Sequence, residues 1–121
     1  MIISIDFDDT IVHSGLYPTI LGLKENAKEV INGFYYDGNE ILINTCRRDE
    51  FQAMAQEFLD SNGIKYHYIN ENLPRLIEAY KEDTRKLFSD IYIDDKNLGG
   101  IPDDWLEIQR MVMKHVLYPN T

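Results

Sequence analysis

Short apolar runs alternate along the chain with longer segments in which apolar residues recur every three or four positions. The first run contains Ile2, Ile3 and Ile5 and stops at acidic residues, which is typical of a buried strand that opens into a polar loop. Runs of the same kind predict three further strands, at residues 40–45, 64–69 and 90–95.

The segments between these runs carry helical spacing. Apolar residues at i, i+3, i+4 and i+7 predict an amphipathic helix over residues 27–34, and similar patterns predict helices over residues 51–59, 73–83 and 105–116. We expect Asp49 to cap the second helix and Pro74 to lie in the first turn of the third.

Residues 11–23 show no period and contain Gly15, Pro18 and Gly22, so we expect an irregular loop there. Elsewhere strands and helices alternate, which predicts a three-layer α/β/α, Rossmann-like fold with a central parallel sheet. The length of 121 residues predicts a single domain over residues 1–121. In such a fold ligands bind beyond the carboxyl ends of the strands.

The composition of the chain argues against several classes of function. The formal charge of −9 argues against a protein that coats nucleic acid, which would need clustered basic residues, and leaves nucleic acid only as a phosphorylated end. The apolar run at the N-terminus stops at Ile5, too early for a signal peptide or a membrane span, and Cys46 is the single cysteine. These features predict a soluble cytoplasmic protein with no membrane partner, and we expect Cys46 to be a buried small apolar residue.

Acidic pairs follow two of the predicted strands. Asp6 and Asp8 stand two positions apart, so we expect their side chains to face one direction, and Asp94 and Asp95 close the last strand. Such carboxylates repel each other unless a cation or a proton intervenes, and Mg²⁺ is the natural hard cation. Helix caps or turns are the plainer explanation for one pair, but two pairs that each close a buried strand favour a site.

Asp6-Phe7-Asp8-Asp9-Thr10 resembles the DxDxT signature of the haloacid dehalogenase-like phosphohydrolases. The rest of that superfamily's pattern follows in order, with Thr45 closing the second strand, Lys86 before the last, and Asp94 and Asp95 after it. The resemblance spans residues 2–97, and the segments at residues 45–48 and 91–100 resemble a short bacterial and phage branch of the superfamily.

This resemblance implies a magnesium-dependent phosphomonoester hydrolase. Asp6 would be the nucleophile and form an aspartyl-phosphate, and Asp8 would act as general acid and base. Thr10 would hydrogen-bond Asp8, while Thr45 and Lys86 would hold the phosphoryl oxygens of a small phosphorylated substrate. The expected metal ligands are the side chains of Asp6 and Asp94 and the backbone carbonyl of Asp8, with Asp95 acting through water or by orienting Lys86.

Several positions remain open at this stage. Lys81 and Lys96 are alternatives to Lys86, and most members of the superfamily have Gly where Asp9 stands. Arg47 either enters the cleft, where its fork suits a second phosphate or a carboxylate of the substrate, or pairs at the surface with Asp49 or Glu50. His13 either touches substrate or is a solvated loop residue.

Two rival functions follow from the same residues. A phospho-acceptor receiver domain of a signalling system is also a parallel α/β domain with acids, Mg²⁺, Thr and Lys, but its acceptor closes the third strand, which here ends in Asn70. The second rival is a catalytically idle relative that acts as a binding module. Because neither gap between motifs is long enough for a cap domain, we expect a capless domain, compatible with a homo-oligomer whose neighbouring subunit covers the site.

Overall fold

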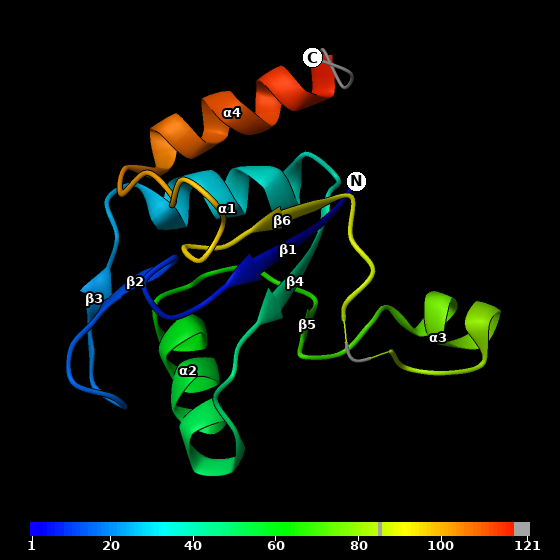
Figure 1. Cartoon of the computed structure of the whole chain (residues 1–121), viewed down its shortest axis with the longest axis horizontal. Coiled ribbons are helices and arrows are strands. Elements are labelled where there is room, and N and C mark those ends of the chain that lie inside the picture. Colours follow the sequence, from blue (N-terminus) through cyan, green and yellow to red (C-terminus); the bar gives the residue numbers. More distant parts are fainter. Residues whose placement is uncertain (85, 118–121) are drawn as a thin grey trace.

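The computed structural model describes residues 1–84 and 86–117, which fold into a parallel sheet flanked by helices, with a small hairpin at one end (Figure 1). The elements in chain order are β1 Ile2–Asp6, β2 Val12–Ser14, β3 Ile20–Leu23, α1 Ala27–Tyr36, β4 Glu40–Asn44, α2 Asp49–Ser61, β5 Tyr68–Ile69, α3 Pro74–Tyr80, β6 Ile91–Ile93 and α4 Trp105–Leu117.

The sheet has the order β5-β4-β1-β6, and all of its pairs are parallel. The chain runs outward from β1 to β4 and β5, then returns to the other side of β1 to form β6. Strand order therefore reverses at β1, and the crevice beside such a reversal is where open α/β sheets bind ligands. In the register, Asp6 lies opposite Asn44 and Ile5 lies opposite Ile93.

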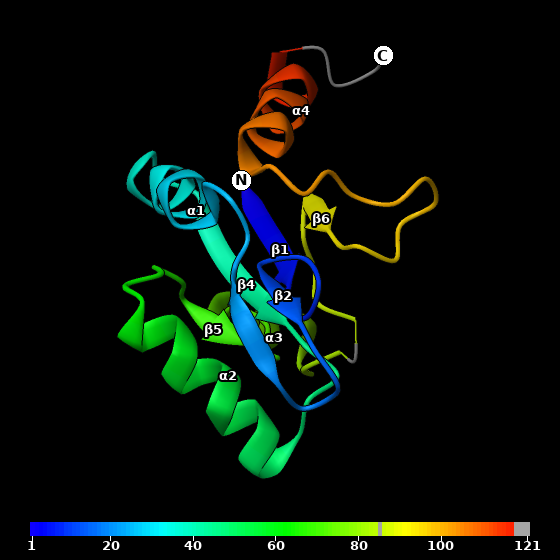
Figure 2. The same cartoon turned by 90° about the vertical axis from the view of Figure 1, so that its left-hand side faces the viewer.

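The two faces of the sheet carry different helices because the crossovers run in opposite directions. Crossovers between parallel strands are right-handed, so the two that lead outward place α1 and α2 on one face, and the return places α3 on the other. Figure 2 shows α1 and α2 together on one side of β4 and β1. The central sheet of the predicted α/β/α fold is thus confirmed.

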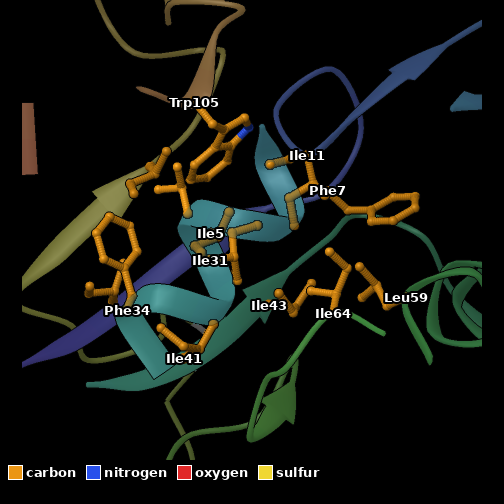
Figure 3. Close-up of a cluster of buried hydrophobic side chains, with 14 of the residues drawn as sticks. Ile5, Phe7, Ile11, Ile31, Phe34, Ile41, Ile43, Leu59, Ile64 and Trp105 are labelled. Carbon is orange, nitrogen blue, oxygen red and sulfur yellow. The ribbon is translucent and has the colours of Figure 1, made fainter. Parts of the chain in front are cut away.

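The main core lies between the first face and helices α1, α2 and α4 (Figure 3). Ile3, Ile5, Ile41 and Ile43 alternate with residues of the opposite face, and all four are completely buried. Trp105, at the start of α4, is also fully buried and packs at the end of this core. A smaller cluster on the second face joins Ile2 and Leu42 to α3 through Leu73 and Leu76.

Four predictions about local structure need correction. Residues 11–23 contain the antiparallel hairpin β2–β3, in which buried Val12 lies opposite Leu23. Gly15 and Pro18 lie in the connection between the two strands, and Gly22 lies within β3. The third strand is reduced to Tyr68–Ile69, because Ile64 packs into the core directly after α2 and its N–H donates to Leu59 instead of pairing with β4.

The other two corrections concern helices. The third helix covers only Pro74–Tyr80, with Pro74 in its first turn as predicted. Asp49 is the first residue of α2 and not its cap, because the extended backbone of Arg48 occupies the N-cap position without a side-chain hydrogen bond. Among the described residues, no helix is both long and apolar enough to cross a membrane.

Candidate functional site

The carboxyl ends of the four parallel strands bring residues from distant parts of the chain to one edge of the sheet. Asp6 ends β1, Thr45 follows β4, Asn70 follows β5, and Asp94 and Asp95 follow β6. Hairpin β2–β3 lies at this same edge, in the direction in which β1 points (Figure 1). The acids of β1 and β6 therefore meet at the reversal of strand order.

Three carboxylates form a cluster at that point. One oxygen each from Asp6, Asp94 and Asp95 lies within 4.8 Å of the others. Thr10 fixes two of them, since its hydroxyl lies 3.1 Å from Asp6 Oδ2 and 3.2 Å from Asp95 Oδ1, and the Asp95 N–H donates to Thr10 Oγ1 at 2.9 Å. Clustered carboxylate oxygens are the donor set that Mg²⁺ prefers, so these residues fit the predicted cation.

Burial and the closeness of the other carboxylates shift the pKa values of Asp6 and Asp95. Burial, a hydrogen bond with Asp95 and the negative charge of Asp94 raise the pKa of Asp6 to about 8. Burial would also raise the pKa of Asp95, but hydrogen bonds from Asp6 and Thr10 outweigh it and lower that pKa below its usual value. Without a cation, the pair therefore holds a proton on Asp6 at neutral pH.

Asp8 does not join this cluster. The strand ends at Asp6, so the alternation expected from β-strand geometry does not extend two residues further. The next turn is closed by Phe7, whose carbonyl accepts N–H groups of Thr10, Ile11 and Val12. Thr10 consequently bonds Asp6 and Asp95 and not Asp8, which corrects the predicted contact.

Arg47 holds Asp8 instead. Its Nε lies 2.8 Å from Asp8 Oδ2 and its Nη2 lies 2.8 Å from Asp8 Oδ1, while Nη2 also donates to the Pro18 carbonyl at 3.0 Å. The Arg47 side chain is 1% exposed and its guanidinium lies between the rings of Phe7 and Tyr17, at 5.4 and 5.2 Å from their centroids. Arg47 is therefore neither paired at the surface with Asp49 or Glu50 nor free in the cleft.

The pair keeps Asp8 ionised. Burial by itself would raise the pKa of Asp8, but hydrogen bonds from Arg47 and from the Ser14 hydroxyl, at 2.7 Å from Asp8 Oδ1, hold that pKa below its usual value. Sequence reasoning missed Ser14, because its contact depends on the hairpin that was expected to be an irregular loop.

Asp9 has a conformational explanation. Its φ is 60°, in the left-handed region that favours glycine and that Asp tolerates better than most residues. Asp9 Oδ1 accepts the N–H of Ser14 at 3.0 Å and so ties the turn after β1 to the end of β2. Asp9 therefore has a structural role in the turn after β1. His13 is exposed in β2.

The lysines are arranged differently from the expectation. The Lys86 ammonium lies 4.8 Å from the ring centroid of Tyr92, and no described hydrogen bond or ion pair joins it to the acids. Lys96 lies 3.7 Å from Asp95 Oδ2, and Lys81 pairs with Glu78 at 2.7 Å. Asp95 thus neighbours Lys96 and does not orient Lys86, so Lys96 is the lysine that the structure brings to the cluster.

A second part of the same edge forms a pocket of about 790 Å³ over the ends of β4 and β5. Asn70 ties those ends together, since its Oδ1 accepts the Thr45 N–H at 2.8 Å and its Nδ2 donates to the Thr45 carbonyl at 2.9 Å. The pocket lining includes Asn44, Thr45, Arg47, Arg48, Gln52 and Asn70. Cys46 also lines it and is exposed, which corrects the expectation that this cysteine is buried.

The N-terminus of helix α4 contacts the loop that carries Thr10. The indole Nε1 of buried Trp105 donates to the Thr10 carbonyl at 3.0 Å, and the Trp105 N–H donates to the Glu25 carbonyl at 3.0 Å. Lys24, only 5% exposed, reaches Asp103 at 2.9 Å. These contacts fix the position of Thr10 and, through it, the orientation of Asp6 and Asp95.

No family model matches the chain, and no curated protein matches it. Among solved structures, it is similar to a conserved protein coded by a locus from Bacteroides thetaiotaomicron, with 32% sequence identity and a TM-score of 0.82. The match covers 94% of this chain and 90% of that one, so the shared fold extends over nearly the whole of both. The chain belongs to the same family as this conserved protein of Bacteroides thetaiotaomicron.

Proposed function

We propose that the chain is a magnesium-dependent phosphomonoester hydrolase of the haloacid dehalogenase-like superfamily, without a cap domain. The observation that carries this proposal is the cluster of Asp6, Asp94 and Asp95 at the reversal of strand order, with Thr10 bonded to two of the three. Three carboxylates at this place are costly to keep together, and a cation that binds phosphate oxygens would relieve the repulsion.

Asp6, Asp94 and Asp95 would hold Mg²⁺, which would offset the negative charge of the phosphoryl group and of the carboxylates. Asp6 Oδ would attack phosphorus in line with the ester oxygen, so that an aspartyl-phosphate forms as the P–O ester bond breaks. Water would then attack the same phosphorus, and release of inorganic phosphate would restore the Asp6 carboxylate. Thr10 would keep the attacking oxygen in place through its bond to Asp6 Oδ2.

The leaving oxygen needs a proton, and Asp8 is the acid that the resemblance assigns. Its contact with Arg47 favours the ionised form, so proton donation by Asp8 requires that contact to loosen in the substrate complex. In the second half of the reaction the ionised form is the useful one, because Asp8 then accepts a proton from the attacking water. The Arg47 pair therefore suits the hydrolytic step without rearrangement.

Strand order favours this proposal over a receiver domain. Receiver-type sheets place the third strand beside the first, whereas here the third strand of the sheet, β5, lies at its edge beyond β4. β5 ends at Ile69 and is followed by Asn70, whose amide is fully engaged with Thr45 and Gln52. An acceptor carboxylate is absent from that position.

The proposal is tested with an aryl phosphate and the variant Asp6→Asn. We expect magnesium-dependent release of phosphate by the natural sequence, loss of turnover on chelation, and recovery on addition of Mg²⁺. Asp6→Asn should abolish turnover, whereas Asp37→Asn, which changes an exposed carboxylate after α1, should not. Undiminished hydrolysis by Asp6→Asn would remove Asp6 as the nucleophile.

Acetyl phosphate separates the rivals. A hydrolase turns it over, a receiver domain stays modified by one phosphoryl group in the intact mass, and an idle binding module does neither. Persistent modification on a residue other than Asp6 would overturn the proposal.

A further inference from the structure

The pocket over the ends of β4 and β5 presents several hydrogen-bond donors that other groups of the protein leave free. Thr45 Oγ1 accepts the Arg47 N–H at 3.0 Å, which leaves the Thr45 hydroxyl hydrogen to donate. Gln52 Oε1 accepts from Asn70 Nδ2 at 3.1 Å, which turns the Gln52 Nε2 group into the remaining donor of that amide. The side-chain amide of Asn70 is already engaged in hydrogen bonds with Thr45 and Gln52.

The charge of the lining also favours an anionic ligand. Two arginines line this pocket and no aspartate or glutamate does, in a chain whose formal charge is −9. Arg48 is exposed at the N-cap of α2, and its side chain makes no ion pair or hydrogen bond with any residue in the described ranges. Nη1 of buried Arg47 is also without a hydrogen-bond partner within those ranges.

The position and size of the pocket connect it with the acidic cluster. Asn44, which lines the pocket, lies opposite Asp6 in the register of β4 and β1, so the two sites are neighbours on one edge of the sheet. A volume of about 790 Å³ falls within the range of ~300–1,000 Å³ of small-molecule pockets, which is more than one phosphoryl group needs.

We propose that this pocket binds a second anionic group, a carboxylate or a phosphate, carried by the leaving group of the substrate. Arg48 supplies the charged contact and Gln52 Nε2 supplies a neutral donor, while the Thr45 hydroxyl remains available to the transferred phosphoryl group. This inference rests on the proposed function and names its substrate class, phosphomonoesters that bear another anion. Arg47 is paired with Asp8 in this structure, so Arg48 carries the uncompensated positive charge of the pocket.

The test compares matched ligands with and without the second anion: phosphoglycerate against glycerol phosphate, phosphogluconate against glucose phosphate, and fructose bisphosphate against fructose monophosphate. For each pair, phosphate release gives kcat and KM, and isothermal titration gives the affinity for the Asp6→Asn variant with Mg²⁺ present. In at least one pair, we expect the ligand that carries the second anionic group to bind about tenfold more tightly than the ligand without it, which is the size of one charge-assisted contact. The carboxylate and bisphosphate pairs show which anion the pocket takes.

Arg48→Gln should remove this tenfold advantage. Arg110→Gln, which removes the same charge from the exposed side of α4, should leave every ligand unaffected. Gln52→Leu is a second variant, away from the helix cap, and should weaken only the binding of ligands that carry the second anionic group. Circular dichroism checks that each variant is folded.

The outcomes of the two proposals are separable. If esters are hydrolysed but no pair differs in affinity, the anion subsite is refuted and the hydrolase stands. In another outcome no ester is hydrolysed, while the ligand with the second anionic group still binds more tightly and Arg48→Gln removes the difference. In that case the anion subsite is supported and the proposed hydrolase activity is refuted. Absence of binding by every ligand would overturn the subsite.

Discussion

Replacing Arg47 by methionine removes the guanidinium that holds Asp8 and keeps most of the aliphatic side chain. Three hydrogen bonds disappear, two to the Asp8 carboxylate and one to the Pro18 carbonyl. Removing one partner of a buried ion pair costs roughly 3–5 kcal/mol, because the other charge is left without compensation. Asp8 retains 28% exposure, so water partly replaces the guanidinium and we expect a loss of about 2–4 kcal/mol at neutral pH.

The loss should depend on pH in a defined direction. The folded-state pKa of Asp8 lies below its ordinary value of 3.8, so the pair contributes stability that is fully present above that value. This contribution disappears as the pH falls through the folded-state pKa. The stability gap between the natural sequence and Arg47→Met should therefore be constant around neutral pH and should narrow in acid.

Urea unfolding at a series of pH values measures the gap. Trp105 is the single tryptophan and is fully buried, so its fluorescence reports unfolding. Arg75→Met is the matched control, since Arg75 also makes a two-pronged contact, with Glu40, but is 58% exposed and should matter far less. Asp8→Asn and the double variant complete a cycle in which the double variant should be more stable than Arg47→Met.

Two results would refute this reasoning. One is an Arg47→Met protein within about 0.5 kcal/mol of the natural sequence, the size expected of an exposed substitution. The other is a gap that persists unchanged in acid, which would place the loss in packing against Phe7 and Tyr17 and not in the ion pair.

Two further predictions concern the neighbouring residues. Trp105→Phe leaves the buried Thr10 carbonyl without its donor and should cost about 1–3 kcal/mol of stability in urea unfolding followed by circular dichroism; a change below about 0.5 kcal/mol would show that the indole bond is dispensable. Binding of Mg²⁺ at pH 7 should release roughly one proton, because the pKa of Asp6, about 8 without a cation, falls when the carboxylate binds metal. Isothermal titration in buffers of different ionisation enthalpy measures this release, and equal release by Asp6→Asn would assign the proton to another group.

The order of strands and helices was largely readable from the sequence. Residues 2–6 and 40–44 form strands whose apolar side chains are buried on both faces, and in residues 91–93 the two isoleucines lie on one face. Such apolar runs can be recognised in the sequence before the partner strands are known. Hairpin β2–β3 escaped prediction because its strands are short and half exposed, so no periodicity marks them.

The acidic cluster was also predictable in outline. Asp6, Asp94 and Asp95 follow strands that parallel pairing brings to one edge, so their proximity follows from topology alone. The choice among lysines was not predictable in the same way, because Lys86 and Lys96 differ only in where loops direct them, one toward Tyr92 and the other toward Asp95.

The sequence by itself determined which residue types end each strand, and therefore that carboxylates and a threonine gather beyond the sheet. Only the tertiary structure decided their partners. Arg47 and Asp8 are 39 positions apart, and their bond depends on the turn at Asp9, which carries Asp8 out of the alternation of β1. Strand periodicity is a local property of the backbone, whereas the direction of a side chain beyond the last strand residue is set by the loop that follows and by whatever packs against it.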